Sequence, residues 1–445
     1  MPASGAGLLL GVGAGAGRGA ARPGPSRGRG PRRAPARPGC LGAGVRRPRR
    51  RWCRGPHMDT LTSVCASDIL ERARRVVLKI GSALLVEASS GMPRRPWLEA
   101  LVDDIVDLRR GGREVLIVSS GAVAVGRRSL PLDLTGRPRL QEKQAAAAVG
   151  QVRLAHAYQE VLGRHGITAA QVLLTLDDSE NRRRYLNARN TIDTLLRLGA
   201  VPVINENDTV ATQEIRFGDN DRLAARVAQM TSADALILFS DIDGLYTADP
   251  NKDPGARFIP TVEALTPEIL AMGGGAVTAH GTGGMVTKLA AAAICMEAGC
   301  AMAIAPGKGT NPVKRLREGG RCTWFLPSHE PHAARKSWIS GSLRAEGVVT
   351  VDEGAARALA QGGSLLPAGV RAIEGDFQRG AAVRVVGPDG RRLAKGLVSY
   401  PAEEARLLMG HKSGEIEALL GYRGRDELIH RDDMVVDTTE ERTAS

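Results

Sequence analysis

The stretch VVLKIGS, Val76–Ser82, decides the fold of this chain. Its apolar run Val76–Ile80 is short, rich in β-branched residues and closed by glycine, which is typical of a buried strand. One charged residue, Lys79, interrupts the run immediately before Gly81. The stretch therefore predicts a buried strand that carries a cation at its carboxyl end.

Outward from this strand, short β-rich runs alternate with helical patterns from residue 75 to about residue 310. Such repeated strand–helix–strand units imply an α/β fold with a mainly parallel sheet and helices on both faces. Further strands are expected at 115–118, 171–174, 201–204, 235–239 and 301–305, and helices at 96–110, 142–162, 188–198, 223–230 and 286–297.

Residues 1–57 differ in composition from the rest: Gly, Ala, Pro and Arg fill 44 of these 57 positions. They contain 13 Arg and no acidic residue, whereas the remainder holds 48 basic and 48 acidic residues. The net charge of +13 therefore belongs to this segment, and the body has no bulk electrostatic reason to bind polyanions. We expect a disordered extension, with three origins open: a misplaced start before Met58 in a GC-rich gene, a genuine tail, or a targeting segment.

Two further features restrict the class of protein. No apolar run approaches the roughly 18 residues that a membrane helix needs, so we expect no membrane span. None of the six cysteines forms a CxxC pair, which indicates reduced thiols in a cytoplasmic protein.

The character of the sequence changes after Trp338. Short β runs at 348–351, 383–386 and 396–398, with the turn sequence GPDG at 387–390, predict a small β-rich domain. The expected division is a large domain at 70–325, a proline-containing linker at 326–346, a second domain at 347–437 and a flexible tail at 438–445.

Polar residues follow the carboxyl ends of four expected strands, which is where ligands bind in parallel sheets. Two glycine-containing runs add to them. The segments are KIGS at 79–82, SSGA at 119–122, NEND at 205–208, GDND at 218–221, SDIDG at 240–244 and GTGGMVTK at 281–288.

These segments fit phosphoryl transfer to an amino acid. Glycines let backbone N–H groups approach phosphate oxygens, and lysines neutralise the charge that moves during transfer. Each segment alone also fits a purely structural role: Lys79 as a solvated edge charge, the glycines as turns, and Asn205–Asp208 as a loop with Asx turns. The GxxxxGKS and GxGxxG fingerprints are absent after the first strand. Spacing alone predicts an α/β phosphotransferase or a phosphate binder.

The ordered runs VVLKIGS, VSSGAVAVG, RRYLNARNTI, VPVINENDTV, GDNDRLAARVA, DGLYTADP and GTGGMVTK resemble the glutamate 5-kinase branch of the amino acid kinase family. The resemblance covers about Val76–Asp437 and implies an open αβα sandwich. It also implies ATP-dependent phosphorylation of the side-chain carboxylate of L-glutamate to L-glutamyl 5-phosphate, the first step of proline biosynthesis. Acetylglutamate or aspartate kinase activity on the same fold is the neighbouring alternative, and the GDND and INEND runs favour glutamate.

The resemblance assigns roles to single residues. Lys79 and Lys288 match two lysines that hold the transferring phosphoryl group, and Asp221 matches the acid that positions them. Magnesium is expected as the ATP complex. Two residues depart from the family pattern: Ala83 stands where a Ser is frequent, and Ser240 replaces a common Thr but keeps the hydroxyl. Ser120, Asp208 and Asn220 match glutamate-binding positions with Asn205 as a neighbour, and Lys79, Ser240, Asp241, Thr282, Gly283, Gly284, Met285, Val286, Thr287 and Lys288 match ATP-binding positions.

Residues 347–437 resemble a PUA domain, a small β-barrel often found in RNA-modifying enzymes. They contain 12 basic and 14 acidic residues, which argues against tight general RNA binding and leaves a local patch open. An RNA-binding protein led by this domain is the alternative of a different class. As partners, the resemblance implies L-glutamate, ATP, further copies of the chain, and possible channelling to the glutamyl phosphate reductase of the same pathway.

Overall fold

The computed structural model describes residues 66–87, 89–132, 139–211, 219–273, 284–341 and 344–437. The extension expected at residues 1–57 and the tail expected at 438–445 lie outside this part of the chain. The chain divides into two units, Met1–Thr60 and Leu61–Ser445, and the elements below belong to the second.

The main sheet has eight strands in the order β3-β4-β2-β1-β5-β9-β10-β8. Neighbouring strands from β3 to β9 are parallel, and β10 is antiparallel to β9. The six strands expected in this sheet are each confirmed to within two residues, whereas β8 and β10 were not predicted. Their bounds are β1 Arg75–Ile80, β2 Glu114–Ser119, β3 Ala169–Leu174, β4 Val201–Glu206, β5 Ala235–Ser240, β8 Thr261–Val262, β9 Ala301–Pro306 and β10 Thr323–Phe325.

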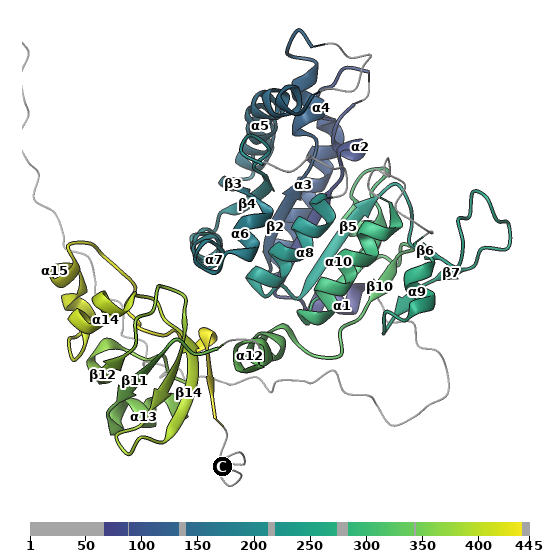
Figure 1. The fold of residues 1–445 in the computed structure, drawn as a ribbon. Helices are drawn as coiled ribbons and strands as arrows, with labels where there is room; N and C mark the ends of the chain where they lie inside the picture. The colour runs from purple at the N-terminus through teal and green to yellow at the C-terminus, as the bar shows by residue number, and fades with distance from the viewer. Residues whose placement is uncertain are drawn as a thin grey trace, which may run out of the picture. The chain divides into compact units, whose positions relative to one another are not determined.

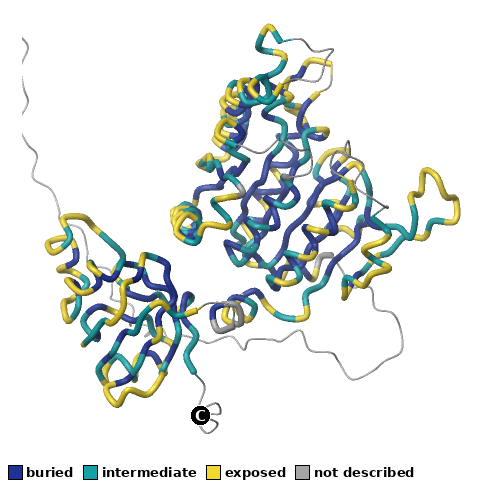
Figure 2. Tube along the Cα trace, viewed as in Figure 1, coloured by how far each residue is buried: buried dark blue, intermediate teal, exposed yellow. Residues whose placement is uncertain are grey.

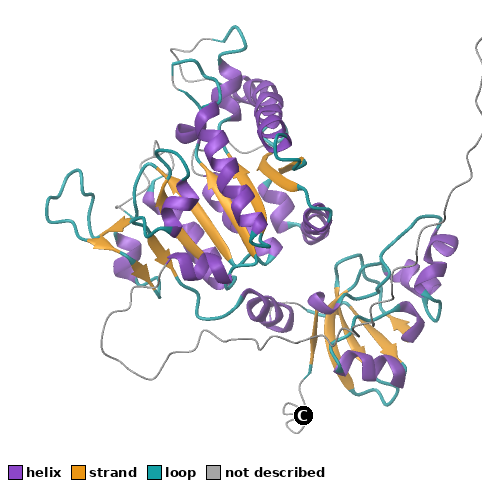
Figure 3. Cartoon of the chain, turned by 180° about the vertical axis from the view of Figure 1, so that it is seen from behind, coloured by secondary structure: helices purple, strands orange, loops and turns teal. Residues whose placement is uncertain are grey.

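Helices cover both faces of this sheet (Figures 1 and 3), so the αβα sandwich is confirmed. One face packs against α1 (Ala66–Arg72), α3 (Arg95–Arg110), α5 (Leu140–Gly163) and α11 (Pro312–Arg317). The other face packs against α7 (Arg182–Arg197), α8 (Asp219–Thr231) and α10 (Met285–Glu297). Shorter elements are α2 Ser82–Leu85, α4 Ala122–Arg127, α6 Leu176–Glu180, α9 Pro267–Ala271, and the pair β6 Leu245–Tyr246 and β7 Phe258–Ile259.

Strand β1 shows how the sheet aims its polar residue. Val76, Leu78 and Ile80 belong to the core on the α3 and α5 side, whereas Val77 belongs to the core on the α8 and α10 side. Successive strand residues alternate between the two faces, so Lys79 shares the face of Val77. The strands form the buried centre of the sandwich in Figure 2. Because side chains alternate between the two faces along β1, the Lys79 ammonium points toward α8 and α10.

Helices α7, α8 and α12 differ from the expected pattern. Helix α8 begins at Asp219, four residues earlier than expected, so Asn220 and Asp221 lie in its first turn. Helix α7 begins at Arg182, six residues earlier than its apolar face indicates, because Asn181 caps it by accepting a hydrogen bond from the backbone N of Arg184. Helix α12, Pro331–Gly341, occupies much of the segment expected as a linker. Pro331 is the first residue of that helix, where a proline is tolerated because the missing N–H would have no partner there.

The second domain has its own five-stranded sheet, in the order β12-β11-β13-β14-β15, and its own core. Helices α13 Glu353–Ala360, α14 Ala402–Leu408 and α15 Ile416–Leu420 accompany it, with 3₁₀ turns at Pro367–Gly369, Ser413–Glu415 and Arg431–Asp433. The strands are β11 Gly347–Val351, β12 Val370–Glu374, β13 Ala382–Val386, β14 Arg392–Leu397 and β15 Met434–Val436.

Candidate active site

Four adjacent parallel strands bring their carboxyl ends to one edge of the main sheet. In the order β4-β2-β1-β5, Val118 pairs with Ile204, and Ile80 pairs with both Ser119 and Phe239. Strands lie about 4.8 Å apart, so the ends of β4 and β5 are separated by about 14 Å. The polar residues that follow these strands therefore line one continuous edge, with Lys79 near its middle.

Asp221 lies between two lysines at this edge. Its Oδ1 is 2.6 Å from the Nζ of Lys79, and its Oδ2 is 3.2 Å from the Nζ of Lys288. These side chains come from β1, α8 and α10, and none of the three residues is more than 9% exposed. We call Lys79, Asp221 and Lys288 the buried triad.

The buried triad carries one net positive charge. Burial of Asp221 opposes its ionisation, but the two neighbouring ammonium groups outweigh burial and hold the pKa of this carboxyl below its ordinary value. The carboxylate therefore stays ionised and compensates only one of the two lysines. A buried uncompensated charge is costly, so this arrangement favours an anionic ligand.

The beginning of α10 lies beside the triad. The Thr287 hydroxyl is 3.1 Å from Asp221 Oδ2 and 2.8 Å from the carbonyl oxygen of Gly284. Gly284 is the N-cap and provides no side chain, so the first N–H groups of this 13-residue helix are left to other acceptors. Met285 is half-buried and Val286 is exposed, while Thr282 and Gly283 lie outside the described residues.

The end of β5 holds the second ATP-matching segment. The buried Ser240 hydroxyl donates a hydrogen bond of 3.0 Å to Oδ1 of the exposed Asp241. The carbonyl oxygen of Ser240 accepts a bond of 2.7 Å from the backbone N of Gly307, which fixes the strand end. The Ser240 hydroxyl, which stands where the family commonly has a Thr hydroxyl, is thus hydrogen-bonded to a carboxylate at the edge of the sheet.

On the other side of Lys79, the end of β4 and the loop after it bury two polar residues. Asn205 Oδ1 accepts a hydrogen bond of 2.9 Å from the backbone N of Glu206. Asp208 is 6% exposed, and burial raises the pKa of its carboxyl to about 6, although a hydrogen bond from Gln151 acts in the opposite direction. Ionising a buried carboxyl costs free energy, and a cationic partner would offset that cost.

Two further residues complete this side of the edge. Ser120 is half-buried, and its backbone N donates a bond of 3.0 Å to the carbonyl oxygen of Ile80. Asn220 Oδ1 is buried and has no hydrogen-bond partner among the described residues. A buried acceptor without a partner is rare in native proteins and indicates a donor supplied by a ligand or water.

The structure thus brings four predicted residues into direct contact: Lys79, Asp221, Lys288 and Thr287. It places three others at the ends of strands along the same edge: Ser120, Asn205 and Ser240. Gln151 of α5 was not predicted, although its Nε2 donates a hydrogen bond of 3.2 Å to the carbonyl oxygen of Glu206 at the end of β4, and its side chain lowers the pKa of Asp208. Its sequence signal is a polar residue four positions after Ala147, on the buried face of an amphipathic helix.

Metal sites in proteins are built mainly from His, Cys, Asp and Glu side chains. Within the described part of the chain, no group of three or more such residues is arranged to hold a metal ion. In the same residues, no helix combines the length and the apolar character that crossing a membrane requires.

The family models and the sequence relatives agree with this architecture. The model of the amino acid kinase family matches residues 74–306, and the PUA domain model matches residues 347–420. A glutamate 5-kinase from Rhodospirillum rubrum is 74% identical over 81% of this chain and 96% of its own length. A glutamate 5-kinase from Paramagnetospirillum magneticum is 65% identical over 83% of this chain and 99% of its own. A UMP kinase structure from Ureaplasma parvum aligns with a TM-score of 0.41 at 18% identity, covering 57% of this chain and 99% of that one.

Proposed function

The chain belongs to the amino acid kinase family, within its glutamate 5-kinase branch, and we propose how its own residues carry out that reaction. The reaction is transfer of the γ-phosphoryl group of ATP to the side-chain carboxylate of L-glutamate, which yields L-glutamyl 5-phosphate and ADP. This is the first step of proline biosynthesis. The residue roles below are inferred from the geometry of the sheet edge.

The chemistry needs no general base. A carboxylate oxygen of glutamate attacks the γ-phosphorus, the bond from that phosphorus to the bridging oxygen breaks, and ADP takes the electron pair. Glutamate side chains have a pKa of about 4.3, so the nucleophile is already ionised at neutral pH. Asp221 therefore acts as a positioning residue for the two lysines and accepts no proton from the substrate.

Lys79 and Lys288 are the proposed catalytic residues. During transfer, charge spreads over the oxygens of the phosphoryl group and moves from the nucleophile to the leaving group. Preorganised cations on either side of a single carboxylate stabilise that charge without having to reorganise. Their burial strengthens the effect, because water does not screen them.

Glutamate is proposed to lie over the ends of β4 and β2. Its ammonium would donate to the buried carboxylate of Asp208 and to Asn220 Oδ1, which has no partner among the described residues, with Asn205 adjacent. Its α-carboxylate would accept hydrogen bonds from donors in the region of Ser120. The side chain would then extend toward Lys79, across part of the roughly 14 Å that separate β4 from β5.

ATP is proposed to lie on the opposite side of Lys79, over β5 and the beginning of α10. Ser240, Asp241 and the segment from Thr282 to Lys288 are its expected contacts. Both oxygens of Asp221 are engaged by the lysines, so we expect Mg²⁺ to arrive on the nucleotide phosphates and not on this carboxylate. When bound there, Mg²⁺ neutralises charge on the β- and γ-phosphates.

A cytoplasmic location is proposed from the state of the cysteines. Cys295, Cys300 and Cys322 are free and buried, in keeping with a reducing, cytoplasmic compartment. Acyl phosphates are reactive toward water, which gives a chemical reason for direct transfer of the product to the next enzyme. We expect the active form to be a homo-oligomer.

The buried triad is the single observation that carries this proposal. It is tested by trapping the acyl phosphate with hydroxylamine in the presence of ATP and glutamate, N-acetylglutamate or aspartate. We expect turnover with glutamate. N-acetylglutamate lacks the ammonium that Asp208 is proposed to bind and should react poorly. Preferential turnover of N-acetylglutamate or aspartate would contradict the placement of the substrate.

A further inference from the structure

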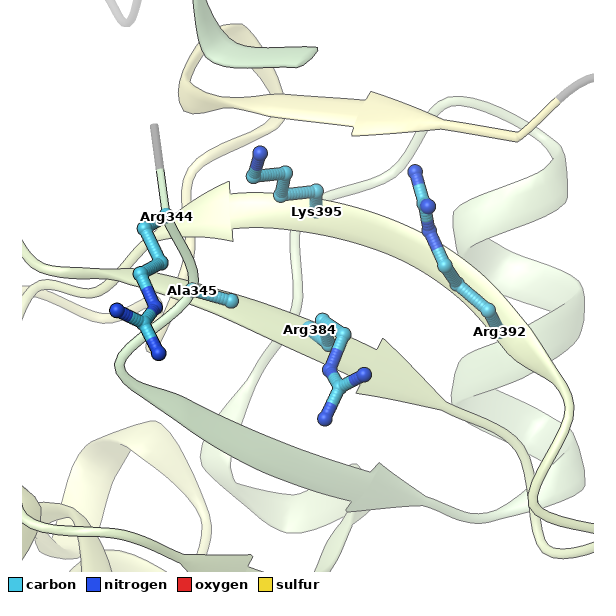
Figure 4. A pocket seen from close by; sticks show the side chains of 5 residues that line it. All are labelled: Arg344, Ala345, Arg384, Arg392 and Lys395. Atoms are coloured by element: carbon cyan, nitrogen blue, oxygen red, sulfur yellow. The ribbon is translucent and has the colours of Figure 1, made fainter. Parts of the chain in front are cut away.

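The second domain has a pocket of about 410 Å³ that the proposed kinase chemistry does not use. Figure 4 shows four cationic side chains around it, from β13, from β14 and from the segment before β11. Its lining is Arg344, Ala345, Arg384, Arg392 and Lys395. The domain as a whole has a net negative formal charge, so this concentration of cations is local.

Strand pairing places two of these cations directly opposite each other. In the antiparallel pair of β13 and β14, Arg384 is the partner of Lys395. Their neighbours Val383, Val385 and Ala394 lie in the domain core, so Arg384 and Lys395 point to the other face. Like charges directly opposite each other destabilise a sheet. The fold therefore places two cations side by side on this face of the sheet.

Nearby carboxylates neutralise only part of this charge. Arg392 Nε lies 3.0 Å from Asp437 Oδ2, and Glu346 is engaged by Arg182 at 3.4 Å. Among the described residues, no ion pair to a carboxylate is found for Arg384 or Arg344. Burial and the positive charge of Arg392 lower the pKa of Lys395, which is consistent with a surplus of positive charge.

We propose that this pocket binds a phosphate-type polyanion. Arginine guanidinium groups match phosphate oxygens with two parallel hydrogen bonds, and three of the four cations are arginines. Among the described residues, no aromatic side chain lines the pocket, so this part of the lining offers no platform on which a nucleobase would stack. Recognition thus addresses the linked phosphate groups of a small polyphosphate compound.

The test measures binding of tripolyphosphate and of a single-stranded oligouridylate to the full chain by calorimetry, at two salt concentrations. The variants are Arg384→Gln and Arg384→Gln/Lys395→Gln, and the matched control is Arg423→Gln, an exposed arginine of the same domain outside the pocket. Because the proposed active site also binds phosphates, the informative quantity is the difference between the pocket variants and the control.

We expect the pocket variants to lose a class of binding sites, or to bind at least tenfold more weakly, as loss of a charged hydrogen bond predicts. Their glutamate kinase activity should not change. Without ligand, Arg384→Gln should unfold at the same or a higher temperature than the wild type, because it removes repulsion. Tripolyphosphate binding that the pocket variants lose would support a small polyphosphate ligand, whereas loss of oligouridylate binding alone would contradict it. Equal binding of both probes by the pocket variants and the control would overturn the proposal.

Discussion

Lys79 of β1 and Asp221 of α8 form an ion pair of 2.6 Å, although the two residues are 142 positions apart in sequence. Only 1% of the Asp221 side chain is exposed to solvent. The same carboxylate holds Lys288 through its other oxygen. One acidic residue thus fixes the spacing of two cations, and it does so on the face of the sheet that alternation in β1 assigns to Lys79.

Asp221→Asn should therefore lower kcat while leaving the fold intact. Asparagine has the same shape but no charge, so the two lysines would repel each other and lose their common anchor. We expect kcat to fall by about 100-fold or more, the scale of losing preorganised charge stabilisation. Steady-state kinetics and the thermal midpoint are measured together. Asp253→Asn, in an exposed loop, is the control. An unchanged kcat in a folded variant would contradict the positioning role.

Lys288→Ala should act mainly on kcat. This side chain is expected to strengthen its interaction as charge spreads over the transferring phosphoryl group, so its loss should lower kcat by about 100-fold or more. The KM for glutamate should change little, because the ammonium and backbone carboxylate of glutamate are bound elsewhere. An effect confined to KM would mean that Lys288 binds glutamate and does not stabilise transfer.

Asp208→Ala should act mainly on the KM for glutamate. Its proposed contact with the substrate ammonium is distant from the reacting carboxylate and is similar in the ground and transition states. Losing a charged hydrogen bond of about 1.5–3 kcal/mol corresponds to a roughly 10- to 100-fold increase in KM. The control is Asp241→Ala at the opposite end of the edge, which should affect the KM for ATP. A change in kcat alone would refute the assignment.

Glutamate binding should weaken as pH falls through about 6. Burial raises the pKa of Asp208 to about 6, so the free enzyme takes up a proton there below this pH. A protonated carboxyl cannot pair with an ammonium, and affinity should fall about tenfold for each pH unit down to about pH 5. The glutamate side chain has a pKa of about 4.3 and remains ionised in this range.

Calorimetric titration of glutamate without ATP, between pH 5 and 8, measures this dependence directly. Asp208→Asn is the matched control, because it keeps the shape of the side chain but cannot titrate. It should bind weakly and with no pH dependence in this range. The same decline in both proteins would assign the titration to another group.

Six of the eight strands of the main sheet were predictable because short apolar runs closed by turns are typical of buried parallel strands. The other two, β8 and β10, are only two and three residues long and gave no such run. The positions of Lys79, Asn205 and Ser240 at strand ends followed from parallel topology. The contact between Asp221 and Lys288 did not, since 67 residues separate them and no local pattern encodes which helices pack together. Only the family resemblance indicated that they meet.

Other features were hidden because one local signal is compatible with two structures. Pro331 indicated a break, yet it begins α12, since proline is compatible with a first helical turn. Gln151 looked like one polar residue in an alanine-rich helix, and its role depends on Asp208, which is distant in sequence. The glycines of α4 and α5 carried no signal that distinguished close packing from flexibility.

Those glycines lead to the last prediction, on stability. Helices α4 and α5 pack backbone against backbone: a Cβ at Gly150 would lie 1.8 Å from the carbonyl oxygen of Ala122, and one at Gly126 would lie 1.7 Å from that of Ala146. Alanine at either position forces the helices apart. We expect Gly150→Ala to destabilise the fold by about 3 kcal/mol, at the upper end of overpacking effects.

Gly163→Ala is the matched control at the far end of the same helix, where an added Cβ meets nothing within 4 Å. It should leave stability unchanged or raise it by up to about 1 kcal/mol, because alanine favours the helix over glycine. Urea unfolding measures both variants. Gly150→Ala should also raise the KM for glutamate, since α5 carries Gln151, which bonds the end of β4 and lowers the pKa of Asp208, and α4 begins two residues after Ser120. Equal stability of the two variants would show that the α4–α5 contact adapts, and that close packing there does not position the site.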